Sequence, residues 1–378
     1  QSERLDLYHK YAQELIDKGY ADYFYYKKDN AGKKRDYSQK ENVEVITQEG
    51  ILEHVKPSSI KQMIEMKDWV VKMKIPKDMM IKVYDQIRGE IVFASSQVTE
   101  QVLLKSDGFP TYHLAVVVDD HLMEISHVVR AEEWLSSFPK HKLLYDYFGW
   151  EMPPFFHTAT LRNPDKSKLS KRHGHTNVIW YKENGYLPEA ILNYLALLGW
   201  SHPEEKEIFS LDEFIQLFDL KDIRPVAPIF DLQKLTWMNQ QYIQNMDADK
   251  LVVKILEFYP DMHLDEAKVR QLIPLLKTRM ETLKDFEALT GFFFSVPEVK
   301  PRSDIEKEVV IDLRALFNDL KNWTEEGVLL SFKEVLKKHS LRMPVLYYLF
   351  TGNEKGLPLP QSLVLLGKDE VVRLLTAL

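Results

Sequence analysis

Residues 165–174 read Asp165-Lys166-Ser167-Lys168-Leu169-Ser170-Lys171-Arg172-His173-Gly174, which places three lysines and an arginine within seven positions. This much like charge cannot enter a core, because burying an unpaired charge is too costly. A polyphosphate is a natural ligand for such a segment, held by lysine point charges and a forked guanidinium. Composition alone favours a solvated basic loop without a ligand. The order of the residues around Leu169 therefore has to decide between the two interpretations.

Length and composition describe an ordinary globular protein. The chain has 378 residues, of which 45% are hydrophobic and 28% charged, so two or three domains with real cores are expected. It contains no cysteine, which excludes disulfides and cysteine-ligated zinc and fits a cytoplasmic location. No apolar run reaches membrane-spanning length, and the N-terminus lacks a signal-peptide pattern. The net charge of -7 argues against non-specific coating of nucleic acid but allows a specific RNA partner.

The first 110 residues predict an α+β module. An amphipathic helix is expected over residues 2–18, capped by Ser2 and ended by Gly19. The polar segment 27–57 predicts loops and short helices. Four strands are expected in the alternating segment that follows, at 69–74, 79–83, 90–93 and 102–104.

A change of character follows at residue 112. The run Tyr112-His113-Leu114-Ala115-Val116-Val117-Val118 is short and rich in β-branched residues, which predicts a buried parallel strand that ends at Asp119-Asp120. A second such run covers residues 125–130. A helix then begins near Pro139 and ends at Gly149. Polar groups at the carboxyl ends of buried parallel strands are where open α/β folds bind ligands.

The chain from residue 187 onward predicts almost only helices. Pro188 near the start and Gly199 at the end mark the first one. The remaining helices are expected at 211–219, 249–258, 265–295, 304–322, 324–339, 341–350 and 368–378.

Arg130 is the most informative single polar residue outside the basic stretch. It follows a predicted buried strand, where a guanidinium is costly unless a carboxylate or phosphate pairs with it. A structural salt bridge and a ligand site both remain open from this position alone. His113, His121 and His127 have irregular spacing, so no metal site is expected. The sequence has no dinucleotide glycine fingerprint, P-loop or nucleophile elbow.

Several segments, in order along the chain, resemble bacterial-type glutamyl-tRNA synthetases, which are class I aminoacyl-tRNA synthetases. Lys168-Leu169-Ser170-Lys171-Arg172 resembles the Lys-Met-Ser-Lys-Ser signature of that class, in its glutamyl form. The likeness covers essentially the whole chain. The other matching segments are residues 1–5, 104–115, 118–123, 129–134, 185–190, 230–235 and 365–368.

The resemblance implies a function, glutamate–tRNA ligation, and roles for named residues. In the family, the counterparts of Tyr112, Arg130 and Trp134 line the glutamate pocket, and Arg130 would pair with a substrate carboxylate. Glu133 would lie near ATP. The catalytic signature residues would be Lys168, Lys171 and Arg172, with the two lysines holding the triphosphate while glutamate attacks the α-phosphate.

The resemblance also implies partners. The helical C-terminal third is similar to the family's anticodon-binding region, and Arg279 aligns with an arginine that reads the third anticodon base. The expected substrates are glutamate, tRNA(Glu) and ATP with Mg²⁺. Neither zinc nor a membrane is expected to take part, and the protein is expected to be a cytoplasmic monomer.

Three departures from the family pattern limit these expectations. Val116 stands where some members carry a substrate-contacting Asn, and Leu346 where an Arg is common. The family's first nucleotide-binding half, with its His-Ile-Gly-His-type motif, has no counterpart ahead of Gln1. The alternative expectation is therefore a non-catalytic tRNA-binding fragment or paralogue. A glutaminyl enzyme is disfavoured, because that family has β-barrel anticodon domains.

The expected fold class is α/β: the second half of a class I nucleotide-binding fold, an α+β connective insertion, and all-α stem-contact and anticodon-binding domains. The boundaries expected from the resemblance are 1–112 for the connective, acceptor-end-binding insertion, 113–164 for the second half of the nucleotide-binding fold, 165–246 for the lysine-signature loop and helical stem-contact region, and 247–303 and 304–378 for the two anticodon-binding helical domains.

Overall fold

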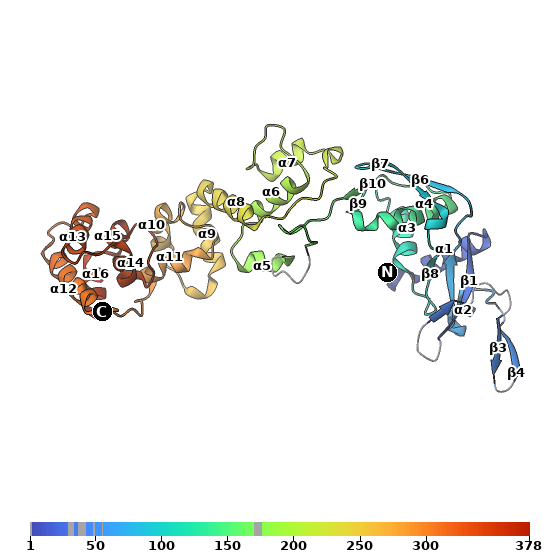
Figure 1. Ribbon diagram of the computed structural model, residues 1–378, viewed down its shortest axis with the longest axis horizontal. Helices are drawn as coiled ribbons and strands as arrows, with labels where there is room; N and C mark the ends of the chain where they lie inside the picture. The colour runs from blue at the N-terminus through green and yellow to red at the C-terminus, as the bar shows by residue number, and fades with distance from the viewer. Residues whose placement is uncertain (1, 29–33, 37–42, 48–49, 55, 170–175) are drawn as a thin grey trace. The chain divides into compact units, whose positions relative to one another are not determined.

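The structure is a computed structural model that describes residues 2–28, 34–36, 43–47, 50–54, 56–169 and 176–378 (Figure 1). The chain divides into two compact units. Unit 1 comprises residues 1–160 and 219–228, and unit 2 comprises residues 161–218 and 229–378. Each unit is described by itself.

The described residues of unit 1 form two four-stranded sheets and a two-stranded ribbon. The first sheet has the order β2-β1-β5-β8, and its strands are antiparallel. The second sheet has the order β7-β6-β10-β9, and β10 runs parallel to both β6 and β9. The strands are β1 Ala21–Lys28, β2 Lys34–Asp36, β3 Val43–Thr47, β4 Gly50–His54, β5 Trp69–Met73, β6 Met80–Asp85, β7 Gly89–Ala94, β8 Gln101–Leu104, β9 Val128–Ala131 and β10 Phe155–Thr158.

Four helices pack with these sheets around one apolar core. They are α1 Leu5–Asp17, α2 Ile60–Met66, α3 Tyr112–Leu122 and α4 Phe138–Phe148. The core runs from Tyr8 of α1 to Phe155 of β10 and includes the buried face of the first sheet. The expected domain boundary at residue 112 thus falls within a continuous core, and it stays a prediction.

The strand predicted for Tyr112–Val118 is wrong, because these residues form the first two turns of α3. Leu114, Ala115 and Val118 are fully buried, and their spacing of one, three and four residues defines one face of a helix. A short apolar run cannot be assigned from periodicity alone, and packing of this face overrode the β-branched preference. Asp119 and Asp120 accordingly lie inside the helix rather than after a strand.

Two further predictions for the N-terminal region are wrong. The segment predicted as loops and short helices contains the last two residues of β1 and all of β2, β3 and β4, whose antiparallel pairing the polar composition concealed. Ser2 does not cap the first helix, because Ser2–Arg4 forms a 3-10 turn and Arg4 precedes α1 without a side-chain cap. The four strands expected between residues 69 and 104 are confirmed.

Helix α4 has both of the predicted end signals. Pro139 lies in its first turn, where a missing amide hydrogen costs nothing. Gly149 ends the helix with φ 75°, in the left-handed region that a side chain disfavours. The second predicted apolar run is confirmed as β9, which ends at Ala131 and therefore places Arg130 near the carboxyl end of a parallel strand.

Unit 2 is helical, as the sequence predicts. One predicted helix, over 265–295, is two: α10 ends at Leu276, and Asp285 begins α11 by accepting hydrogen bonds from the amides of Glu281 and Thr282. The helices are α5 Val178–Glu183, α6 Pro188–Gly199, α7 Leu211–Leu217, α8 Leu232–Asn245, α9 Ala248–Phe258, α10 Glu266–Leu276, α11 Asp285–Phe294, α12 Asp304–Asp319, α13 Glu325–Lys338, α14 Met343–Thr351, α15 Leu359–Leu366 and α16 Lys368–Ala377.

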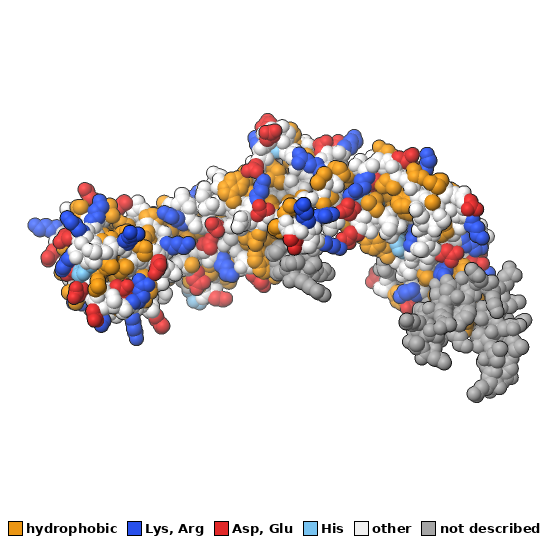
Figure 2. Space-filling model, viewed as in Figure 1, with side chains coloured by type: hydrophobic (Ala, Val, Ile, Leu, Met, Phe, Trp, Pro, Cys, Tyr) orange, Lys and Arg blue, Asp and Glu red, His pale blue; other side chains and the backbone are white. Residues whose placement is uncertain are grey.

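Three apolar clusters hold unit 2 together: one around α5, α6 and α8, a second built mainly from α9 to α11, and a third from α12 to α16. Gly185 joins the first two, since a β-carbon there would lie 2.5 Å from the amide nitrogen of Lys284. The domain boundary expected at 303/304 falls between the last two clusters and stays a prediction. Lysine and arginine side chains are interspersed with acidic ones over the face drawn in Figure 2. No described helix is long and apolar enough to cross a membrane.

Candidate active site

The parallel pairing of β9 and β10 sets Arg130 directly beside His157. The Nε of Arg130 donates a hydrogen bond of 2.9 Å to the Nε2 of His157. A guanidinium has only donors, so this imidazole nitrogen must be the acceptor. The neighbouring strand therefore supplies a neutral partner for the arginine.

Asp85 holds the His157 ring at the nitrogen that does not face Arg130. The Nδ1 of His157 donates to the Asp85 carboxylate at 2.7 Å, and the amide of His157 donates to the same oxygen at 3.0 Å. The other carboxylate oxygen accepts from the amides of Ile87 and Arg88, at 3.0 and 2.9 Å, in the turn after β6. Neither Asp85 nor His157 is exposed to solvent. Four donors thus fix this carboxylate, and it fixes the imidazole.

A second imidazole meets Arg130 from helix α4. The Nη1 of Arg130 lies 3.0 Å from the Nδ1 of His141, which must accept because the guanidinium cannot. The Nε2 of His141 then carries the proton and donates to the Nδ1 of His113 in α3, at 2.9 Å. His141 is 1% exposed. The chain of hydrogen bonds thus runs from Asp85 through His157, Arg130 and His141 to His113.

The electrostatics keep all three imidazoles neutral. Burial lowers the pKa of His113 to about 4, and the positive charges of Lys140 and Arg130 act in the same direction. Burial also lowers the pKa of His141 well below its usual value, again reinforced by Arg130. The pKa of His157 is lowered chiefly by burial, although its hydrogen bond to Asp85 opposes the shift. Neutral histidines are what the guanidinium needs as acceptors.

One nitrogen of Arg130 remains without a partner. Its Nη2 is buried and makes no hydrogen bond, whereas Nε and Nη1 are both satisfied. Burial lowers the pKa of Arg130, and the hydroxyl of Tyr112 and the carboxylates of Asp120 and Asp85 partly offset this. The sequence left a structural salt bridge open for Arg130, and among the described residues no carboxylate forms an ion pair with it. A buried donor without a partner is costly, and an added acceptor would satisfy it.

The structure brings together the three residues that the resemblance places in one pocket. Tyr112 begins α3 and Trp134 lies in the 3-10 turn after β9, and their ring centroids are 4.4 Å apart. Both rings are partly exposed, at 40% and 37%. The Arg130 guanidinium lies 4.9 Å from the ring of Phe155, which lends it a cation–π contact. Val116, the first departure from the family pattern, packs partly buried against the same core.

Glu133 is exposed on the 3-10 turn Glu132–Ser137. Its neighbour Glu132 forms a 2.6 Å ion pair with Arg88 and accepts a hydrogen bond from the amide of Thr160. The turn that presents Glu133 and Trp134 is thus tied to the loop after β6. Its conformation depends on the same loop that holds Asp85.

The basic stretch lies in unit 2, and only its first part is described. Asp165 folds residues 163–168 into a compact turn, in which its carboxylate accepts from the amide and the hydroxyl of Ser167 at 2.9 and 2.6 Å. Lys166 has φ 66° within this turn. The backbone of Lys168 pairs with that of Arg162 in an isolated antiparallel β-bridge. Lys171 and Arg172 lie outside the described residues.

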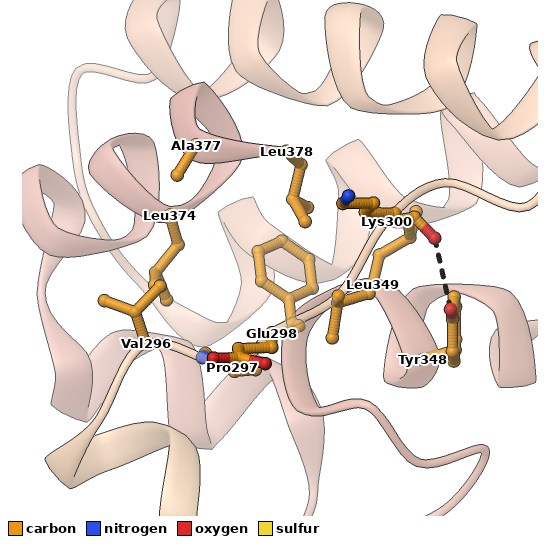
Figure 3. A pocket seen from close by; sticks show the side chains of 11 residues that line it. Val296, Pro297, Glu298, Lys300, Tyr348, Leu349, Leu374, Ala377 and Leu378 are labelled. Carbon is orange, nitrogen blue, oxygen red and sulfur yellow. Dashed lines mark hydrogen bonds between the residues drawn. The ribbon is translucent and has the colours of Figure 1, made fainter.

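The predicted anticodon residue and a second candidate surface also lie in unit 2. Arg279 is exposed in the turn that follows α10. A pocket of about 570 Å³ lies between the 296–300 segment, α14 and α16, where the Tyr348 hydroxyl donates to the Lys300 carbonyl at 3.1 Å (Figure 3). Leu346, the second departure from the family pattern, is fully buried and cannot contact a ligand.

Sequence reasoning did not identify Asp85, His141 or His157. His157 follows Phe155-Phe156 in a buried strand, and His141 lies in the middle of a helix with an apolar face. A lone histidine in an apolar run is the available signal, and it is more often a satisfied core residue than a functional one. Only the pairing of β9 with β10 shows that His157 meets Arg130.

Comparisons with known proteins identify the family of the chain. Residues 1–237 match the family of class I tRNA synthetases (E and Q), catalytic domain, and residues 241–378 match an anticodon binding domain. A glutamate–tRNA ligase of Psychrobacter sp. is 40% identical and aligns with 98% of this chain and 75% of its own length. One from Thermus thermophilus is 39% identical, with coverages of 99% and 81%. A crystal structure of the Elizabethkingia meningosepticum glutamate tRNA ligase with its amino acid superposes with a TM-score of 0.74 at 30% identity, covering 100% of this chain and 82% of that one.

The fold and the two family matches therefore define a class I tRNA synthetase with a helical anticodon-binding region. Within that class, the chain belongs to the glutamate–tRNA ligase family.

Proposed function

We propose that this protein activates glutamate with ATP to glutamyl-adenylate and transfers the glutamyl group to the 3' end of tRNA(Glu). The observation that carries the proposal is the unsatisfied Nη2 of Arg130, a buried positive donor beside the exposed rings of Tyr112 and Trp134. Family membership supplies the reaction class.

In this proposal, Arg130 binds a carboxylate of glutamate. Because Nε and Nη1 of the guanidinium already have hydrogen-bond partners, the side chain is ordered before an anion binds. Binding at Nη2 therefore adds no entropic cost of ordering the side chain. Tyr112 and Trp134 flank the bound amino acid and exclude water, which strengthens the charge pair. A neutral glutamine amide would leave the positive charge of Arg130 unpaired, and this supplies discrimination between the two amino acids.

The phosphates of ATP are assigned to the basic stretch. Lys168, Lys171 and Arg172 would meet the charge that builds on the leaving pyrophosphate as glutamate attacks the α-phosphate. Glu133 would lie near the nucleotide. Magnesium would arrive bound to the phosphates of ATP, as part of the substrate. The reaction needs no zinc in this proposal.

The helical region is assigned to tRNA. Arg279 is exposed at a turn and suits base edges and phosphates. The five-part division expected from the sequence, with boundaries at 112, 164, 246 and 303, remains our proposed domain assignment. We also propose that the protein works as a cytoplasmic monomer.

The test is amino-acid-dependent exchange of pyrophosphate into ATP by the full-length protein, followed by charging of tRNA(Glu). Exchange should require glutamate, and glutamine should not replace it. Exchange that is equally fast with both amino acids would refute the pocket assignment. The non-catalytic alternative draws no support from the comparisons, since the catalytic-domain family covers residues 1–237.

A further inference from the structure

We infer that His141 and His157 are positioning residues for the amino-acid substrate: they hold the guanidinium of Arg130 from two sides and leave its Nη2, which acts with the nearby hydroxyl of Tyr112 but makes no hydrogen bond of its own, to bind a carboxylate. The inference rests on the proposed function, in which Arg130 receives a carboxylate of glutamate. It adds two residues and their supporting partners, Asp85 and His113, which neither touch the proposed substrate nor follow from the family match.

The geometry divides the donors of Arg130 between two elements. His157 of β10 accepts from Nε at 2.9 Å, and His141 of α4 lies 3.0 Å from Nη1. Two acceptors on different nitrogens fix both the position and the rotation of a planar group, which a single hydrogen bond cannot do. The orientation of Nη2 is therefore set by β10 and α4 before a substrate arrives.

The two imidazoles are themselves fixed at their far ends. Asp85 accepts from His157 at 2.7 Å and is held by three backbone amides, while His141 donates to His113 at 2.9 Å. These contacts also select the tautomers. His157 must carry its proton on Nδ1, and His141 must carry its proton on Nε2, for every hydrogen bond in the chain to have one donor and one acceptor.

The chemistry explains why histidines rather than carboxylates hold this arginine. A carboxylate at either position would orient the guanidinium equally well but would also neutralise it and weaken its attraction for an anion. A neutral imidazole accepts a hydrogen bond and leaves the positive charge intact. Of the two carboxylates that act on Arg130, Asp85 is separated from it by the ring of His157, and Asp120 forms no ion pair with it among the described residues.

The kinetic test uses matched pairs at each histidine. The amide oxygen of Asn can replace Nδ1 of His141, and that of Gln can replace Nε2 of His157, whereas Leu fills the space without an acceptor. His141→Leu and His157→Leu should each raise the KM for glutamate about tenfold, with the KM for ATP changed less than about twofold, in pyrophosphate exchange. His141→Asn and His157→Gln should restore most of the affinity. His127→Leu, at an exposed position, is the control and should have no effect.

Equal effects of the Leu and the amide variants would overturn the inference, because they would show that the histidines only fill space. A different result would refute the proposed function itself. If Arg130→Ala itself leaves the KM for glutamate unchanged, the assignment of the pocket is wrong, and the positioning role is lost with it.

A second measurement needs no variant and no activity. Selective ¹⁵N labelling of histidine reports the tautomer of each ring by NMR, and single substitutions that retain the fold assign the signals. We expect His157 protonated at Nδ1 alone and His141 protonated at Nε2 alone at neutral pH. Either ring in the opposite tautomer, or protonated on both nitrogens, would overturn the inference even if the Leu variants fail to fold.

Discussion

Two regions of this protein are suited to bind anions, and they do so in opposite ways. Arg130 is a single, partly buried guanidinium with hydrogen-bond partners on two sides, and the orientation of its unsatisfied Nη2 is defined before binding. The basic stretch instead gathers several cations close together in sequence, and the two that the structure describes, Lys166 and Lys168, are exposed around the turn that Asp165 and Ser167 form. Arg130 is suited to recognise an anion by the fixed orientation of its donors, and the basic stretch to attract one by the number of its charges.

The difference matches what each proposed ligand requires. A carboxylate of glutamate is a small planar group in its ground state, and a fixed fork can recognise it. The charge on a reacting triphosphate moves from one oxygen to another during the reaction, and several lysine point charges can follow it. Selectivity is therefore expected to depend on Arg130 and its histidines, and rate on the lysines. The predictions below test that separation.

The largest effect is expected from Arg130→Ala. It removes one half of a desolvated charge pair, which costs about 2–5 kcal/mol of glutamate binding, and should leave the KM for ATP nearly unchanged. Arg130→Lys keeps the charge but not the fork, and should recover part of the loss. The measurement is the KM for each substrate in pyrophosphate exchange. Equal losses for glutamate and ATP would mean that Arg130 has a structural role in both.

Asp85→Asn should destabilise the protein, whereas Asp165→Asn at the basic turn should not. The amide group introduced by this substitution would point a donor at a site where all four present contacts are donors, which costs about 3 kcal/mol in the free energy of unfolding. Asp165→Asn retains the acceptor that the Ser167 amide needs and should change stability by less than about 0.5 kcal/mol. Urea denaturation of the two variants measures the contrast. Similar costs would contradict the idea that only one region is preorganised.

Lys171→Ala should slow the chemical step by about a hundredfold, the size of losing one charge contact to the transition state. The KM for glutamate should stay within about twofold, since the lysine is assigned to the phosphates. Lys166→Ala, in the described turn of the same stretch, serves as the control for a general loss of positive charge. If Lys166→Ala is as slow as Lys171→Ala, the stretch acts through its summed charge and not through the signature positions.

How much the sequence could predict differed between these regions for a physical reason. Four of the strands, the ends of α4 and most of the C-terminal helices follow from local periodicity and from proline and glycine signals. Residues 112–118 did not, because an apolar face of α3 and a buried strand have the same composition when the run is short. The strands β2, β3 and β4 were concealed by polar residues, β2 at a sheet edge and β3 with β4 in a two-stranded ribbon.

The site was predictable only as far as its residues carry a motif. Tyr112, Arg130 and Trp134 were identified from the resemblance, and the structure brings them together, although their roles remain proposals. Asp85, His141 and His157 come from three separate elements, and each looks like an ordinary core or turn residue in its own segment. Their relation to Arg130 depends on the parallel register of β9 and β10, which cannot be predicted from a local sequence pattern.

The smallest effect, and the most direct test of the neutral histidines, is a dependence of stability on pH. The folded-state pKa values of His113, His141 and His157 are all lowered, so the unfolded chain binds protons that the folded protein does not. Stability is therefore complete above the ordinary histidine pKa of about 6.5 and is lost as the pH falls below it. For His113 the loss continues down to about pH 4.

Between pH 7.5 and 6.5 the three histidines together should reduce the free energy of unfolding by about 1 kcal/mol. Urea denaturation at the two pH values measures this, and His141→Asn should reduce the slope, because it removes one titrating group. The charged groups that act on the three rings are Asp85, Arg88, Arg130 and Lys140. A protein equally stable at both pH values would mean that the imidazoles around Arg130 are protonated in the folded state, and could not be the acceptors that orient it.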